Sequence, residues 1–191
     1  MPTTKRPQGL LPSRQAGSGP APGGVTTYRV GASAPSAIAF NDPVAMVNAA
    51  IQPATATTDY PLGVATGFQW VDPTTKLPTW SKSLPAGTSS YDSNIWVQVA
   101  DGSNNTYIVV ADATVSYGDI GFNYALSGVG VPDTNGRSTA VLKGSTRTSG
   151  TGAQYRVIGP VQYADNLFGS DAFPYVEVKI ITHRDSRVSI A

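Results

Sequence analysis

The sequence predicts an all-β protein: a single antiparallel β-barrel or β-sandwich with an extended N-terminal arm. Composition is the first observation, because the 191 residues include 20 Gly and 15 Pro and only 13% are charged. The second is that Glu177 is the only glutamate, whereas exposed helices usually draw on Glu and Lys. The third is that short β-rich runs, separated by turn residues, recur about every ten to fifteen residues from Val25 onward.

Residues 1–24 are predicted to form a flexible arm, and residues 25–191 the β-domain. The arm holds five Pro, five Gly and no acidic residue, so it cannot bury enough surface to fold alone. Residues 1–30 carry four basic and no acidic side chains, whereas residues 31–191 carry nine basic and twelve acidic ones. So few charges would neutralise few phosphates, and we therefore expect no direct binding of nucleic acid.

The sequence also excludes several function classes. It has no cysteine, which removes thiol chemistry and thiolate zinc sites. No apolar run approaches the roughly 20 residues that span a bilayer, and Met1 is followed by a polar, Pro-rich stretch instead of a signal-peptide core. We expect a soluble, unprocessed chain without a membrane partner.

Alternating hydrophobicity marks the strands. The clearest is Tyr175–Ile181, where apolar residues alternate with Glu177 and Lys179. The run Ile95–Val99 alternates as well, and the turn residues 101–105 that follow it predict a hairpin with the next run, TYIVVA. Further strands are predicted at Thr26–Val30, Ala37–Phe40, Leu62–Val71, Thr79–Lys82, Ile120–Leu126, Ala140–Lys143 and Gln154–Val161.

One segment fits two structures. Asp42 and Pro43 can cap and begin a helix, with Val44 and Ile51 on one face, or they can open a strand. We favour the strand.

Residues suited to catalysis are few. His183 is the only histidine and stands at the end of a predicted strand, so we expect it at the surface or in an interface. Asp101, Asp112 and Asp119 could supply paired carboxylates, but each has turn-forming neighbours, which favours a structural role. A hydrolase remains an alternative if the fold brings three or more carboxylates into one cleft.

Two segments resemble ligand-binding loops without completing the motif. Asp133 to Gly136 begins like a calcium loop, but Gly144 stands where the glutamate should be, which favours a tight turn. Residues 144–152 are glycine-rich but lack the Gly-Lys-Ser/Thr ending of a phosphate loop, which favours a mobile surface loop. The sequence therefore predicts no metal, no cofactor and no catalytic residue.

Aromatic residues give a further alternative. Trp70, Trp80 and Trp96 could form a platform for sugars or bases, although we expect most of them to pack in the core or at a barrel end.

A longer pattern begins with Pro43-Val and continues with Pro61-Leu-Gly-Val, Gly67-Phe-Gln-Trp70 followed by Asp-Pro, and Pro85-Ala-Gly87. It then runs through Asn135-Gly-Arg-Ser138, Tyr155-Arg-Val-Ile-Gly-Pro160 and Asp165-Asn-Leu-Phe168 to the closing strand. This succession, over most of residues 37–183, resembles capsid-associated structural proteins of tailed bacteriophages. It consists of turn and core positions and contains no catalytic signature.

The resemblance implies a non-enzymatic capsid decoration, or cement, protein of the virion. Such a protein is made in the host cytoplasm, binds the outer surface of the head shell and stabilises contacts between major capsid protein subunits, and symmetry favours a dimer or trimer on the lattice. Arginines of the arm would pair with carboxylates of the shell, and its leucines would enter an apolar groove. The expected contact residues are Lys5, Arg6, Leu10, Leu11 and Arg14.

The competing hypothesis is a carbohydrate-binding or host-adhesion β-module of the virion. Trp80, Tyr91 and Trp96 would then line an exposed sugar site.

Overall fold

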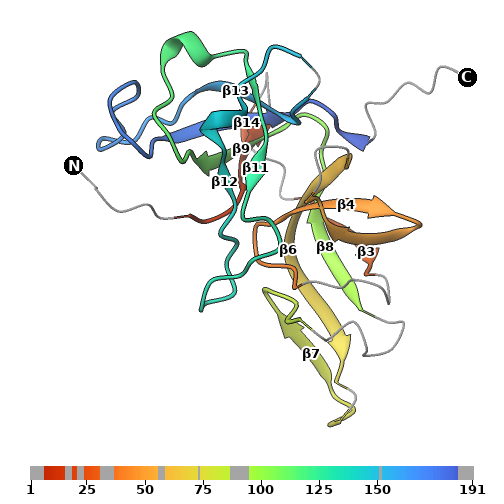
Figure 1. Ribbon diagram of the computed structural model, residues 1–191. Coiled ribbons are helices and arrows are strands. Elements are labelled where there is room, and N and C mark those ends of the chain that lie inside the picture. The colour runs from red at the N-terminus through yellow and green to blue at the C-terminus, as the bar shows by residue number, and fades with distance from the viewer. Residues whose placement is uncertain are drawn as a thin grey trace, which may run out of the picture.

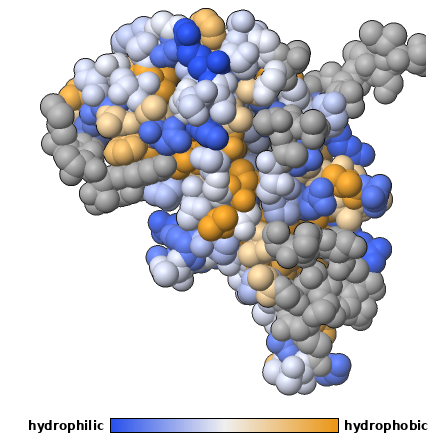
Figure 2. Space-filling view, in the orientation of Figure 1, coloured by the Kyte–Doolittle hydropathy of each residue, from blue (hydrophilic) through white to orange (hydrophobic). Residues whose placement is uncertain are grey.

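The computed structural model describes residues 7–15, 19–20, 24–30, 37–55, 59–72, 74–86, 95–150 and 152–184. They form an upper and a lower lobe, each built on a sheet of short strands (Figure 1). The same two lobes are visible in the space-filling view, where hydrophilic and hydrophobic residues are interspersed on the upper lobe (Figure 2). The strands pair antiparallel throughout both sheets. Helical structure with both ends in these residues consists of short 3-10 turns, η2 (Tyr117–Asp119) and η3 (Gly144–Thr146). The predicted all-β, antiparallel class is confirmed.

The first sheet forms the upper lobe. Its strands, in spatial order, are β10 (Asn123–Tyr124), β13 (Tyr155–Pro160), β14 (Tyr175–Ile180), β9 (Asn105–Val110), β1 (Leu11–Gln15) and β2 (Gly19–Pro20). A separate pair, β11 (Leu126–Ser127) and β12 (Val141–Leu142), joins the end of β9 through a bridge between Ala111 and Leu142. Alternate residues of the long strands point into one core, which includes Tyr107, Val109, Tyr155, Val157, Val176 and Val178.

The second sheet forms the lower lobe and closes on itself. Its order is β3 (Thr26–Arg29), β8 (Trp96–Ala100), β6 (Pro61–Val71), β4 (Pro43–Val47) and β5 (Ala50–Pro53), and β7 (Pro78–Ser81) pairs with the far half of β6. A parallel bridge joins Val30, just after β3, to Ile51 of β5. The result is a small barrel from which the β6–β7 hairpin projects at the lower end (Figure 1). Its core includes Val44, Ile51, Leu62, Phe68, Val97 and Val99.

Most predicted strands are present, and the differences lie at turns. The segment after Asp42 is the hairpin β4–β5, as favoured, because Asn48 and Ala49 both take positive φ angles (49° and 61°) that make a two-residue turn. Residues 37–40 make isolated bridges at Ile38 and Phe40 instead of a strand. Of the strand predicted at residues 120–126, Asn123 and Tyr124 form β10.

The predicted hairpin between β8 and β9 is wrong. β8 pairs with β3 and β6 in the second sheet, whereas β9 pairs with β1 and β14 in the first. The turn itself exists, since Asn105 N donates to Gly102 O, but it carries the chain from one lobe to the other. The two strands also bury side chains in different cores, Val97 in the lower and Tyr107 in the upper, in keeping with their places in different sheets.

The N-terminal segment also differs from the prediction. The sequence assigns residues 1–24 to an arm outside the domain, whereas the structure places Leu11–Gln15 in the first sheet as β1, between β9 and β2. Residues 1–6, 16–18 and 21–23 lie outside the described part of the chain. The proline- and glycine-rich stretch cannot fold alone, but β9 offers an unpaired edge that a short strand can complete.

A buried carboxylate lies where the lobes meet. Asp42 is fully buried; it accepts hydrogen bonds from Ala39 N at 2.8 Å, from Gly130 N at 3.2 Å and from the Ser138 hydroxyl. Burial raises the pKa of Asp42 to about 6, and these three hydrogen bonds oppose that rise. Since its own backbone O accepts from Ala65 N of β6, Asp42 ties the lower sheet to the 128–138 loop.

We expect Ser138→Ala to lower the free energy of unfolding at pH 7 by about 1–2 kcal/mol, because it removes a hydroxyl donor from a buried carboxylate. Urea unfolding followed by tryptophan fluorescence measures the effect. Ser145→Ala, at an exposed loop position, is the control and should match the parent protein. Equal stability of both variants would show that Asp42 does not depend on Ser138.

Candidate functional site

The residues expected to contact a partner do not form one exposed arm. Lys5 and Arg6 lie outside the described residues. Leu10 is fully buried among the side chains of the upper core, and its N donates to Asn41 O at 2.9 Å. Leu11 is partly buried at the start of β1. Leu10 is therefore a core residue of this fold and not a surface anchor.

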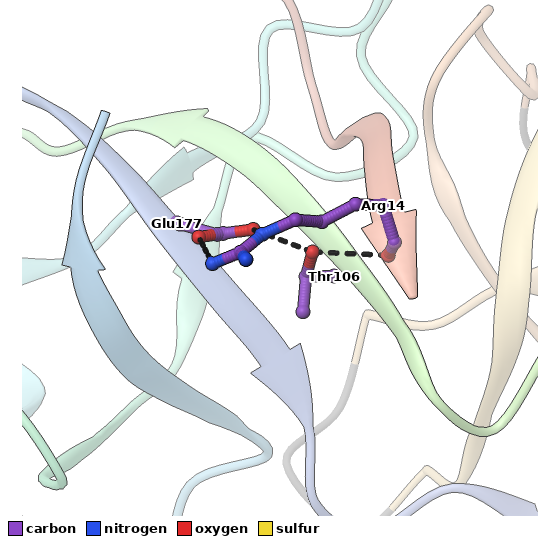
Figure 3. Close-up of polar contacts among 3 residues, drawn as sticks. All are labelled: Arg14, Thr106 and Glu177. Carbon is purple, nitrogen blue, oxygen red and sulfur yellow. Dashed lines mark hydrogen bonds and ion pairs between the residues drawn. The ribbon is translucent and has the colours of Figure 1, made fainter. Parts of the chain in front are cut away.

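Arg14 makes the bidentate ion pair that the sequence led us to expect, but with a carboxylate of its own chain. Its Nε and one terminal nitrogen donate to the two carboxylate oxygens of Glu177, each at 2.7 Å (Figure 3). The Thr106 hydroxyl lies 2.6 Å from Glu177 Oε1 and 3.0 Å from Arg14 O, so its single hydrogen serves one acceptor at a time. These contacts fasten β1 to β9 and β14.

The pair changes the ionisation of both groups. The hydrogen bonds from Arg14, with a smaller one from Thr106, hold the pKa of Glu177 below its ordinary value even though partial burial acts in the opposite direction. The pKa of Arg14 is raised by the same hydrogen bond and charge. The Glu177 side chain is 10% exposed and that of Arg14 is 54% exposed, so the arginine keeps a face toward solvent.

Arg14 is one end of a row of polar side chains across the first sheet. The register places Arg14 opposite Thr106, Thr106 opposite Lys179, Lys179 opposite Arg156, and Arg156 opposite Asn123. Residues directly opposite in an antiparallel pair share a face of the sheet. We call Arg14, Lys179 and Arg156, with the neutral Thr106 and Asn123, the cationic row.

Two members of the cationic row are like charges placed directly opposite each other, an arrangement that destabilises a strand pair. Lys179 Nζ donates to Asn104 Oδ1 at 3.0 Å, and Arg156 Nε donates to Asn123 Oδ1 at 3.0 Å. Among the described residues, no carboxylate pairs with either cation. Both border an open cleft of about 500 Å³, whose other walls are Ser103, Asn104, Ile158, Ile180, Ile181 and Thr182.

The candidate carboxylates have structural partners. Asp101 accepts from the Tyr28 hydroxyl at 2.5 Å, and Asp112 accepts from Gly144 N at 2.7 Å. Asp119 accepts from Ser116 N and pairs with Arg147 at 2.6 Å. In the described part of the chain, no three acidic or histidine side chains come together as a metal site would require.

The two loops resembling binding motifs also have structural roles. Asp133 Oδ1 accepts from Asn135 N and from Arg137 N, both at 2.8 Å, which makes the segment a tight turn. The glycine-rich segment begins with the single-turn helix η3, where Thr146 Oγ1 donates to Lys143 O at 2.6 Å.

Two predictions about single side chains need correction. His183 is buried, with 1% of its surface exposed, because pairing continues beyond β14 through Ile181 N to Gln154 O and keeps this segment against the lobe. Only Trp70 is a core tryptophan, whereas Trp80 and Trp96 are exposed on the second sheet. Tyr91 lies outside the described residues.

Comparison of the chain with protein-family models, with curated proteins and with solved structures finds no match in any of the three. Within the described residues, no helix has the length and hydrophobicity to cross a membrane. Alternation along β13 and β14 predicts that Arg156 and Lys179 point outward, but only the register shows that they line up with Arg14.

We expect Glu177→Gln to lower the free energy of unfolding by about 1 kcal/mol at pH 7, since the charged pair is lost at a partly solvated site. Because folding lowers the pKa of Glu177, its contribution is full above about pH 4.5 and disappears as the pH falls through the folded-state pKa. The difference between variant and parent should therefore shrink below pH 4.5 in urea unfolding.

Thr106→Val is the matched control, because it removes the hydroxyl and leaves the ion pair. It should keep the share of the acid-dependent loss of stability that comes from Glu177, which Glu177→Gln removes. An unchanged acid profile in Glu177→Gln would show that the pair is not coupled to folding.

Proposed function

We propose that this chain is a non-enzymatic capsid decoration protein of a tailed bacteriophage, which binds the outer surface of the head shell. The observation that carries the proposal is the cationic row, which extends from the N-terminal strand across the first sheet. The resemblance in residues 37–183 supplies the partner, the major capsid protein. The row supplies a surface with which that partner could be bound.

The chemistry of the row favours a protein surface that carries carboxylates. Arg156 and Lys179 lie opposite each other, and their side-chain partners among the described residues are amide oxygens, so an arriving carboxylate would relieve their repulsion. Arginine can bind a carboxylate through two parallel hydrogen bonds, as Arg14 does with Glu177. Three cations around one glutamate are too few for tight binding to a phosphate backbone.

The two-lobe shape supports a decorating role. The cationic row and β1 belong to the upper lobe, while the β6–β7 hairpin projects from the lower one (Figure 1). A partner bound along the cationic row would contact strands of the first sheet, to which the β6–β7 hairpin does not belong. A modest contact, repeated in many copies on a lattice and doubled in a dimer or trimer, stabilises the assembled shell by linkage and avidity.

Charge reversal of the cleft tests the proposal. We expect Arg156→Glu and Lys179→Glu each to weaken binding to head shells lacking this protein by at least about tenfold, because a carboxylate partner would then meet a like charge. Co-sedimentation at low and moderate salt measures the affinity, and the parent protein should bind less tightly at higher salt. Lys143→Glu, an exposed position of the upper lobe outside the row, is the matched control and should bind like the parent.

Deletion of residues 1–6 tests the remainder of the predicted contact, because it removes Lys5 and Arg6 but keeps Leu10 in the core. We expect weaker sedimentation with unchanged unfolding in urea.

Shell binding by the cleft variants that equals that of Lys143→Glu would refute the role of the row. No sedimentation by the parent protein at any salt concentration would refute the decoration role itself.

A further inference from the structure

A second cross-strand row lies on the outer face of the lower lobe and has a different chemistry. The register places Arg29 of β3 opposite Trp96 of β8, Trp96 opposite Gln69 of β6, and Gln69 opposite Trp80 of β7. The strand neighbours of Trp96 and Gln69 point the other way, since they are buried in the barrel core. These four residues, which we call the tryptophan row, therefore share one face.

The two tryptophans are open to solvent. Trp80 is 63% exposed and Trp96 is 43% exposed, whereas Trp70 is 8% exposed. A single exposed aromatic residue needs no explanation, because much of any protein surface is apolar. Two indole rings in one register row, with an amide side chain between them, form a defined platform.

The spacing of the platform suits an elongated ligand. Trp80 and Trp96 stand on strands separated by one other strand, so their Cα atoms lie about 10 Å apart. This is the scale of a disaccharide unit in an extended oligosaccharide. The next row pairs Gln98 with Gly67, and Gln98 Oε1 lies 3.5 Å from where a Cβ of this glycine would stand, which places a second amide beside Gln69.

We propose that the tryptophan row binds a neutral, extended oligosaccharide of the β-1,4-linked type. The C–H face of a pyranose ring packs on an indole ring, so Trp80 and Trp96 can each hold one sugar. The hydroxyl groups need both donors and acceptors, which the amides of Gln69 and Gln98 supply. Arg29, at the end of the row, adds donors.

Other ligands fit the tryptophan row less well. A protein interface buries a dry apolar centre, but the centre of this row is an amide that would need its own hydrogen-bond partners. A nucleic acid strand would need several cations along its path, and Arg29 is the one cation of the row. The proposal does not depend on the capsid role, because the two rows lie on different lobes.

Titration of the full-length protein with cellohexaose and with chitohexaose, followed by calorimetry and tryptophan fluorescence, tests the proposal. We expect saturable binding of at least one hexasaccharide with a change in indole emission. Trp80→Ala and Trp96→Ala should each weaken that binding about tenfold or more. Trp80→Phe should retain part of it, because a phenyl ring still packs on a sugar.

Tyr117→Ala is the matched control, since Tyr117 is 69% exposed on the upper lobe, and it should bind like the parent. Unchanged circular dichroism would show that the tryptophan variants still fold. Failure of both hexasaccharides to bind, or equal affinity of parent and tryptophan variants, would overturn the proposal. Tryptophan variants that lose shell sedimentation without any response to sugars would assign the row to a protein partner instead.

Discussion

The fold depends on how the two lobes are joined at residues 39–42. Asp42 brings a carboxylate into the junction, where backbone N–H groups of Ala39 and Gly130 and the Ser138 hydroxyl satisfy it. A buried charge is costly unless it is hydrogen-bonded, so all three donors must be in place when the lobes come together. The adjacent Asn41 accepts from Leu10 N through its carbonyl and donates to Ala65 O, which links the N-terminal segment to β6. The junction thereby fixes where β1 enters the upper lobe.

That constraint explains why the N-terminal residues belong to the fold despite their composition. Gly9 has a φ of 70°, and a Cβ at this position would stand 2.3 Å from Asn41 O, so only glycine lets the chain pass the junction. Leu10 then enters the upper core, and four residues later Arg14 reaches Glu177. Composition predicts disorder for this stretch because it counts residues without regard to their partners, and the partners here are far away in sequence.

Local patterns in the sequence predict where the strands lie, but they do not predict which strands pair. Alternation is local, so the strands at residues 61–71, 155–160 and 175–180 can be recognised from the sequence. Pairing is not local: the turn after Ala100 has hairpin residues, yet the chain crosses to the other lobe. Exposure follows from pairing, which is why Trp96 lies on the surface while Trp70, in an equally aromatic context, lies in the core.

Both proposed surfaces follow from strand register, which the alternation of buried and exposed residues along each strand fixes. A shift of one residue in β14 would send Lys179 into the core and Val178 to the outer face, so the hydrophobic alternation that builds the core also determines the cationic row. The tryptophan row follows in the same way from β6, whose buried Phe68 and Trp70 fix Gln69 outward between Trp80 and Trp96. Since each row is set by the packing of its own lobe, the surfaces can differ in chemistry, one governed by salt-sensitive charge and the other by stacking that salt affects little. The two proposed surfaces are therefore independent, and a substitution in one row can change its chemistry without altering the other row.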